Sequence, residues 1–146
     1  MKKKILIFVV TYKASFRVLH LINKIPFSKL EKSKYKILIS DDNSEDDETI
    51  KYINLAKNKF KSKITLNFNR INIGYGANIK KCLNIAYKKK FDYAVMLHGD
   101  NQYNPKYIYN MIQELNSNQN ISAVCGSRMS KKRSAIKGNM PMYKFL

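Results

Sequence analysis

The segment at residues 91–105, FDYAVMLHGDNQYNP, constrains the fold more than any other part of the chain. Residues 93–97 are apolar without polar alternation, which is typical of a strand buried on both faces of a parallel sheet. Ligands of open α/β sheets bind outside the carboxyl ends of the strands, so we expect the polar side chains that follow to line a crevice. These side chains are His98, Asp100, Asn101 and Gln102.

A helix is predicted directly after this polar segment. Pro105 suits the first turn of a helix, and Asn104 suits its N-cap. An apolar stripe at helical spacing follows, formed by Ile108, Met111, Ile112 and Leu115. We therefore expect this helix to pack on the sheet.

Asp100 and Gln102 are two residues apart on an extended segment, so their side chains point the same way and can share one hard cation. Mg²⁺ or Mn²⁺ held by so few protein oxygens keeps coordination places for the oxygens of a diphosphate. A polar loop that only caps the following helix explains the same residues equally well. These residues alone leave both interpretations open.

Strand and helix alternate along the whole chain. Apolar runs at 5–10, 36–40 and 121–125 predict further strands, and the run at 64–68 alternates with polar residues, as expected near a sheet edge. Apolar stripes at helical spacing follow the runs at 5–10 and 64–68. The stripe after 64–68 contains Ile79, Cys82, Leu83 and Ala86. Without a repeat or linker, this order predicts one α/β domain over residues 1–146, with a mostly parallel, Rossmann-like sheet flanked by helices.

Six of the ten acidic residues lie within 41–48, directly after a predicted strand. Ser44 and Asp47 have the spacing of a capping box, and the acids at 46–48 complement the positive end of the helix that follows. Helix capping thus explains four of the six. Asp41 and Asp42 precede the cap and need another explanation.

Two glycines lie in the segment NIGYGAN at residues 72–78, where a helix begins. Gly74 and Gly76 let the backbone approach a ligand closely and present free N–H groups to a phosphate. A plain tight turn explains two glycines as well, so this spacing alone leaves both interpretations open.

The chain carries 28 lysine and arginine residues against 10 acidic residues, a formal net charge of +18. The lysines are spread over nearly every segment, without the basic stripe and interleaved aromatics of a nucleic-acid module, so we expect an anionic membrane surface or a phosphate-bearing substrate instead of nucleic acid. The sequence contains no long apolar segment and no signal peptide, which predicts a cytoplasmic protein, including the inner face of the membrane. Cys82 and Cys125 are expected to be buried thiols.

Four segments resemble, in this order, those of family 2 glycosyltransferases: VVTYK at 9–13, ISDDNSEDDET at 39–49, NIGYGAN, and VMLHGDNQYNP at 95–105. The last is similar to the segment with the Asp-x-Asp motif, in the LHGD form of bacterial proteins that are similar to dolichyl- and polyprenyl-phosphate sugar transferases. The resemblance covers essentially the whole chain. It implies the GT-A fold and a metal-dependent, inverting transfer of a sugar from a nucleotide diphosphate.

The resemblance also implies roles for single residues. Tyr12 would pack against the nucleotide base, and Asp42 would accept a hydrogen bond from it. The donor-binding residues are then Thr11, Tyr12, Asp41, Asp42, Gly74, Gly76, His98 and Asp100, and the ligands of the divalent cation are Asp100 and Gln102. His98 stands where many relatives have the first aspartate of Asp-x-Asp, and Lys13 replaces the usual asparagine after the tyrosine.

Two later segments, GSRM at 126–129 and KGNMPMYK at 137–144, resemble acceptor-side segments of the family. An arginine fork suits a phosphate, so Arg128 is the candidate for the acceptor phosphate, with Lys131, Lys132 and Arg133 as weaker helpers; a solvated loop explains each of these lysines equally well. A phosphate acceptor needs no general base, which favours a polyprenyl-phosphate-like lipid over a glycan hydroxyl.

Relatives continue beyond the equivalent of Leu146, so we expect a catalytic domain that is incomplete on its acceptor side. The alternatives are a fragment that binds a nucleotide sugar without efficient turnover and a basic nucleic-acid-binding module. The sequence does not indicate the oligomeric state, the base or the sugar.

Overall fold

The computed structural model describes residues 3–31, 33–118 and 120–127. The chain divides into two compact units, Met1–Tyr109 and Asn110–Leu146. All described strands lie in the first unit.

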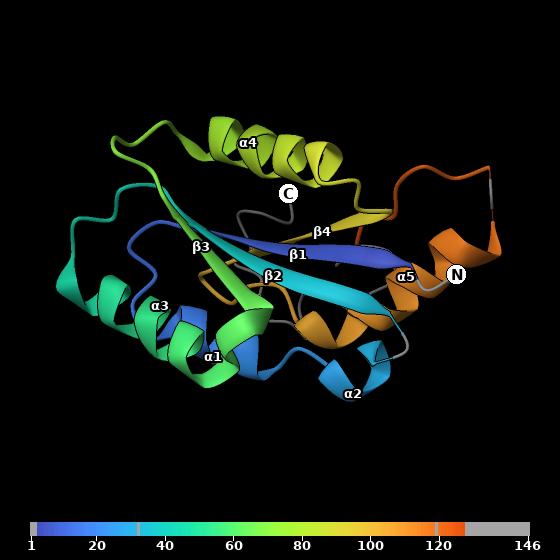
Figure 1. The fold of residues 1–146 in the computed structure, drawn as a ribbon, viewed down its shortest axis with the longest axis horizontal. Helices are drawn as coiled ribbons and strands as arrows, with labels where there is room; N and C mark the ends of the chain where they lie inside the picture. Colours follow the sequence, from blue (N-terminus) through green and yellow to red (C-terminus); the bar gives the residue numbers. More distant parts are fainter. Residues whose placement is uncertain (1–2, 32, 119, 128–146) are drawn as a thin grey trace, which may run out of the picture. The chain divides into compact units, whose positions relative to one another are not determined.

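The first unit is built on a parallel sheet with the strand order β3-β2-β1-β4 (Figure 1). Its strands are β1 (Lys4–Thr11), β2 (Lys34–Asp41), β3 (Ile64–Phe68) and β4 (Tyr93–His98). β3 lies at one edge, as its alternating pattern predicts. The register pairs Thr11 with Asp41 and Val10 with His98, so three strands end at the same level.

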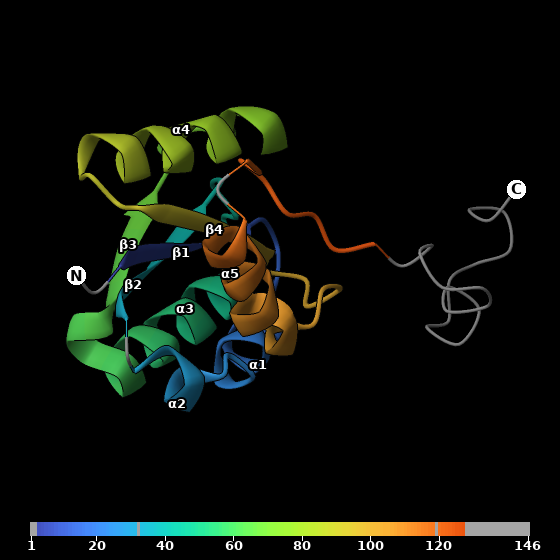
Figure 2. The ribbon, with the colours of Figure 1, turned by 90° about the vertical axis from the view of Figure 1, so that its right-hand side faces the viewer.

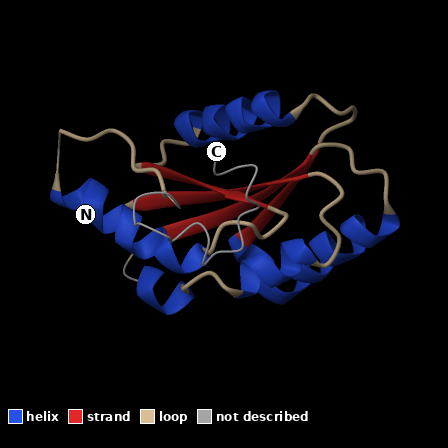
Figure 3. Ribbon diagram, turned by 180° about the vertical axis from the view of Figure 1, so that it is seen from behind, coloured by secondary structure: helices blue, strands red, loops and turns tan. Residues whose placement is uncertain are grey.

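Helices cover both faces of this sheet. The helix α4 (Tyr75–Lys88) lies on one face, and α1 (Arg17–Asn23), α2 (Phe27–Leu30) and α3 (Asp47–Phe60) lie on the other (Figures 1 and 2). A short 3₁₀ turn, Lys61–Lys63, connects α3 to β3. Figure 3 shows the strands as one layer between helices. The α/β prediction is therefore confirmed.

The core of the first unit is centred on β1, which is buried on both faces from Ile5 onward. Because strand side chains alternate, Leu6, Phe8 and Val10 face α4 and pack with Leu38, Cys82 and Ala86. Ile5, Ile7 and Val9 fill the opposite face and are fully buried. Burial raises the pKa of the Cys82 thiol above its ordinary value.

The prediction that residues 93–97 are buried on both faces is wrong. Among the described residues β4 pairs only with β1 and forms an edge of the sheet. Ala94 and Met96 lie beside Leu6 and Phe8 on the α4 face, yet both are exposed, Met96 by 41%. An uninterrupted apolar run in the sequence does not show whether another strand or helix covers the segment, which is why the pattern overstated the burial. Leu83 is likewise exposed, because the buried stripe of α4 follows Asn78, Cys82 and Ala86 instead.

The predicted helix start at Pro105 is confirmed. Asn104 accepts a hydrogen bond from the Lys106 N–H at 3.1 Å, and Pro105 opens the 3₁₀ turn Pro105–Tyr107 that leads into α5 (Ile108–Ser117). No helix among the described residues is long and apolar enough to cross a membrane.

The strand predicted at 121–125 is absent from the described residues, and Cys125 is exposed instead of buried. A short apolar run forms a strand only where a neighbouring strand accepts its backbone hydrogen bonds, and none pairs with it among the described residues. Arg128 and the basic residues at 131–133 lie outside the described part of the chain.

Candidate functional site

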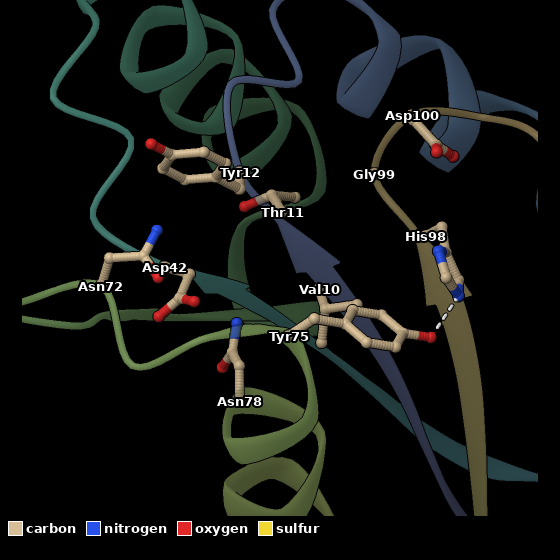
Figure 4. A pocket seen from close by; sticks show the side chains of 10 residues that line it. All are labelled: Val10, Thr11, Tyr12, Asp42, Asn72, Tyr75, Asn78, His98, Gly99 and Asp100. Atoms are coloured by element: carbon tan, nitrogen blue, oxygen red, sulfur yellow. Dashed lines mark hydrogen bonds between the residues drawn. The ribbon is translucent and has the colours of Figure 1, made fainter.

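A pocket of about 280 Å³ opens in the first unit where β1, β2 and β4 end (Figure 4). It is lined by Val10, Thr11, Tyr12, Asp42, Asn72, Tyr75, Asn78, His98, Gly99 and Asp100. Five of the predicted site residues are among them: Thr11, Tyr12, Asp42, His98 and Asp100. Residues far apart in the sequence meet here because the strands are parallel and end in register.

Backbone hydrogen bonds join the strand ends at the floor of the pocket. The Asp42 N–H donates to the Thr11 carbonyl at 2.9 Å, and the Gly99 N–H donates to the Val10 carbonyl at 2.9 Å. A Cβ on Gly99 would lie 2.5 Å from Thr11 Cγ2, so only glycine fits at this position. The two sides of the pocket are therefore held at a fixed separation by β1.

Asp41 lies behind the pocket and does not line it. Its buried carboxylate accepts hydrogen bonds from Thr11 Oγ1 at 2.8 Å, from the Ser44 N–H at 2.9 Å and from Ser44 Oγ at 2.6 Å. The Lys13 N–H donates to Ser44 Oγ at 2.9 Å. Asp41 thus braces the loops that leave β1 and β2, and its contacts are structural.

The predicted capping box at Ser44 and Asp47 is wrong. The N-cap of α3 is Asp46, whose side chain accepts from the Thr49 N–H at 2.6 Å. Ser44 Oγ instead donates to the buried carboxylate of Asp41 at 2.6 Å, and a charged acceptor makes a stronger hydrogen bond than a neutral one.

Asp42 lies at the pocket wall and is only 4% exposed. Its Oδ1 accepts from Asn69 Nδ2 at 2.8 Å and from the Ile73 N–H at 3.0 Å. Asn69 Oδ1 in turn accepts from Lys81 Nζ at 2.6 Å. This chain of polar contacts holds the carboxylate in one orientation before any ligand arrives.

Tyr12 presents its ring to the same side of the pocket and is 51% exposed (Figure 4). Lys13 Nζ lies 5.3 Å from the ring centroid. An exposed aromatic face beside a fixed carboxylate suits a flat heterocycle that stacks and donates a hydrogen bond.

Gly74 and Gly76 do not line the pocket; their neighbours in the same segment do. Gly74 has φ +84 at the N-cap of α4, a backbone conformation that favours glycine. Asn72 Oδ1 accepts from the Gly74 N–H at 3.0 Å, and Asn78 Nδ2 donates to the Ser40 carbonyl at 3.0 Å. The glycine is needed for the turn that brings Asn72, Tyr75 and Asn78 to the pocket.

Three aromatic rings gather on the opposite side. Tyr75 Oη lies 2.8 Å from His98 Nε2 (Figure 4). The ring centroid of His98 is 4.9 Å from that of Tyr103. Burial, followed by the nearby Tyr103 and Asp100, raises the pKa of Tyr75, so its hydroxyl stays protonated at neutral pH.

Asp100 lies beside these rings and is partly buried. Its Oδ1 accepts from the Gln102 N–H at 3.0 Å, and Gln102 is exposed and does not line the pocket. The described residues contain no group of three His, Cys, Asp or Glu side chains able to hold a metal by themselves. Asn101 Oδ1, next in the chain, is buried without a hydrogen-bond partner. These oxygen donors fit a hard cation that takes most of its ligands from a bound diphosphate and water.

Sequence reasoning did not single out Asn69 or Gly99, and in the segment NIGYGAN it named the two glycines instead of Asn72, Tyr75 and Asn78. The signal for the asparagines was present as a recurrence of asparagine from 67 to 78 around a strand end, where amides commonly bind buried backbone groups. The sequence carried no comparable signal for Gly99, because its tight contact is with Thr11 in another strand.

The family model described as Glycosyl transferase family 2 matches residues 7–142. No curated protein sequence matches the chain.

Solved structures share the fold. The mannosyltransferase PcManGT from Pyrobaculum calidifontis, in complex with GDP-Man and Mn²⁺, is 14% identical with a TM-score of 0.64, over 79% of this chain and 33% of that one. S. aureus TarS 1–349 is 20% identical with a TM-score of 0.59, over 90% of this chain and 40% of that one. The same protein with UDP-GlcNAc gives 20% identity and a TM-score of 0.60, over 90% and 39%. This chain therefore spans between a third and two fifths of their length. With the GT-A fold and a family match over nearly all its residues, the chain belongs to glycosyl transferase family 2.

Proposed function

We propose that this chain binds a nucleotide diphosphate sugar and serves the metal-dependent, inverting transfer of that sugar to a lipid-phosphate or glycan acceptor. The convergence of Tyr12, Asp42 and Asp100 on one pocket carries this proposal. Membership of the family supports it. The solved complexes of PcManGT with GDP-Man and Mn²⁺ and of TarS with UDP-GlcNAc support a donor of the same class.

Tyr12 and Asp42 hold the base in this proposal. The exposed ring of Tyr12 stacks on the heterocycle, and the oriented carboxylate of Asp42 accepts a hydrogen bond from it. Thr11 and Asp41 hold these two side chains in place through their own hydrogen bond at 2.8 Å. The base is thereby fixed, which positions the diphosphate along the pocket toward Asp100.

Asp100, which lines the pocket, and Gln102 would hold the cation. When bound, Mg²⁺ or Mn²⁺ supplies positive charge that stabilises the nucleotide diphosphate as it leaves. The Gln102 N–H orients the Asp100 carboxylate. His98, held by Tyr75, forms the adjacent wall toward the donor. Gly74 shapes the turn on the nucleotide side. The Gly76 N–H, in the first turn of α4, is the proposed backbone donor to a phosphate.

A polyprenyl-phosphate-like lipid is the proposed acceptor. The only carboxylates that line the pocket in the described residues are Asp42 and Asp100, and both already have donor-side roles. A phosphate oxygen is anionic at neutral pH and attacks without a general base. Arg128 remains our candidate for binding that phosphate, and the net charge of +18 suits contact with an anionic membrane at its inner face. We propose that residues 1–146 belong to a single catalytic domain.

Calorimetry with UDP-, GDP- and dTDP-sugars, with and without Mn²⁺, tests donor binding. We expect saturable binding that strengthens with Mn²⁺; the absence of metal-dependent nucleotide binding contradicts the proposal. Release of nucleotide diphosphate on addition of polyprenyl phosphate tests turnover. Binding without release supports the narrower function of a nucleotide-sugar-binding chain.

A further inference from the structure

We propose that the first unit docks on an anionic phospholipid membrane through the face of the sheet that α4 covers. This inference rests on the proposed function, because the proposed lipid-phosphate acceptor lies in a membrane, and it names the surface that meets that membrane. The charge of this face, its exposed apolar side chains and a second hollow beside α4 support it.

The segment that contains α4 is uniformly basic. In the first unit, α4 lies on one side of the sheet and α1, α2 and α3 lie on the other (Figures 1 and 2). Residues 69–91 contain six lysine or arginine residues and no acidic residue, whereas α3 begins with the acids at 46–48. Four lysines of the α4 segment are exposed: Lys80, Lys88, Lys89 and Lys90. A negatively charged lipid surface attracts such a cluster of lysines.

The same segment carries the two most exposed large apolar side chains of the described residues. Tyr87, in the last turn of α4, is 83% exposed, and Ile71, in the loop that leads into α4, is 68% exposed. Leu83 lies one turn before Tyr87 on the same side of the helix and is also exposed. Exposed apolar side chains among lysines are typical of a helix that lies in a membrane interface. Aliphatic side chains such as Ile71 and Leu83 do not stack on bases, so this pattern favours a membrane over nucleic acid.

A second hollow, of about 400 Å³, lies on the same side of the sheet, beside the C-terminal end of α4. Its lining combines apolar side chains from β1, β2 and α4 with four lysines and no acidic residue: Lys4, Lys34, Lys36 and Lys89. Lys4 and Lys34 are register partners in neighbouring strands, and like charges that lie directly opposite are unfavourable. A phosphate headgroup placed between them relieves this repulsion. The hollow therefore suits the headgroup of an anionic lipid.

Docking through α4 places the donor pocket next to the membrane surface. Tyr75 and Asn78, in the first turn of α4, line that pocket. The helix that lies on the membrane therefore also forms one wall of the pocket, and a lipid phosphate in the same leaflet reaches it without leaving the membrane.

Co-sedimentation of the whole chain with vesicles is the first test. We expect binding to vesicles of equal parts phosphatidylglycerol and phosphatidylcholine and none to phosphatidylcholine alone. Lys80→Gln with Lys88→Gln should weaken binding by roughly fivefold for each lysine, or roughly 25-fold for the pair. Lys51→Gln with Lys59→Gln removes the same charge from α3 on the opposite face and should bind as wild type does. Equal losses for the two pairs overturn the inference.

Tyr87→Trp tests insertion directly, because the chain contains no tryptophan. Its emission should shift to the blue on addition of the phosphatidylglycerol vesicles and be quenched when brominated lipids are included. Leu55→Trp places the same reporter at an exposed position of α3 and should show neither change. If both reporters respond alike, or if Tyr87→Trp does not respond, the inference is overturned. Circular dichroism of each variant verifies that it folds.

Nucleic acid is the competing partner for a basic face. Binding of a single-stranded RNA that depends on Lys80 and Lys88, without vesicle binding by the wild type, overturns the inference. Nucleotide-sugar binding without vesicle binding also overturns it and leaves the proposed function standing. Vesicle binding that needs Lys80 and Lys88, without any nucleotide binding, supports the docking face and contradicts the proposed function.

Discussion

The two ends of the pocket are built differently. At the base end, Asp42 is 4% exposed and its Oδ1 is held by two hydrogen bonds from the 69–73 segment. At the cation end, Asp100 is only partly buried, and the hydrogen bond shown to its carboxylate is from the Gln102 N–H within its own turn. One end is oriented by several elements of the fold, and the other by its own loop.

This difference indicates how a donor binds. A preorganised wall loses little conformational entropy when the base arrives, so it contributes affinity and selectivity. The cation end gains its full set of oxygen ligands only when a diphosphate brings them. The base end should therefore depend on the integrity of the fold, and the cation end on metal. Four substitutions test this contrast.

Asp41→Ala should have the largest effect, on stability. It leaves the buried donors of Thr11 and Ser44 without their charged acceptor, and we expect a loss of roughly 3–5 kcal/mol in the free energy of unfolding. Urea denaturation followed by circular dichroism measures it. Asp46→Ala is the control from the same acidic run and should cost only about 1 kcal/mol, as the loss of an N-cap. Equal losses for the two variants contradict the bracing role of Asp41.

Asp100→Asn should abolish Mn²⁺-dependent nucleotide binding while leaving the fold intact. Loss of the one carboxylate beside the cation should lower the affinity by about 2 kcal/mol or more, roughly 30-fold. Calorimetry with and without Mn²⁺ measures this change, and an unchanged thermal midpoint verifies the fold. Asp47→Asn removes the same charge from an exposed helix position and should change neither quantity. Unchanged Mn²⁺-dependent affinity in Asp100→Asn refutes the cation site.

Gly99→Ala should destabilise the protein by about 1–3 kcal/mol, because the added Cβ would lie 2.5 Å from Thr11 Cγ2. Thermal unfolding measures the loss. Thr11→Ser in the same chain removes that methyl group and should restore part of the stability. Gly76→Ala, where no atom lies within 4 Å of the added Cβ, should be neutral or slightly stabilising. A Gly99→Ala variant as stable as wild type contradicts the close approach of the strand ends.

Tyr75→Phe should have the smallest effect. It removes the hydrogen bond to His98 and should weaken donor binding by about 0.5–1.5 kcal/mol without changing which base is preferred. Because the pKa of Tyr75 is raised above 10.0, this contribution should persist below pH 10 and be lost only as the pH rises through the raised pKa. Nucleotide titrations at pH 7 and above pH 10 compare wild type with the variant. A difference already lost at pH 7 contradicts the assignment.

Much of the fold follows from local patterns. The unbroken apolar run at 5–10 predicts a central strand, and the alternating run at 64–68 predicts an edge strand; both predictions are confirmed. The same reasoning overstated the burial of 93–97 and placed a strand at 121–125 that the described residues do not form. An apolar run indicates that a segment tends to be buried, but it does not indicate which helix or strand covers it.

The sequence by itself determined that acidic and polar side chains follow the strands, and the parallel order of the strands then required them to meet at one edge. The resemblance assigned the base contact to Asp42, but only the tertiary structure shows what distinguishes it from Asp41, the adjacent residue in the chain. Thr11 and Ser44 bind Asp41, while Asn69 and the Ile73 N–H orient Asp42 at the pocket wall. The two carboxylates have the same chemistry, and their hydrogen-bond partners distinguish them. Both oxygens of Asp41 accept hydrogen bonds, from Thr11 and from the nearby Ser44, whereas the hydrogen bonds that orient Asp42 all go to its Oδ1.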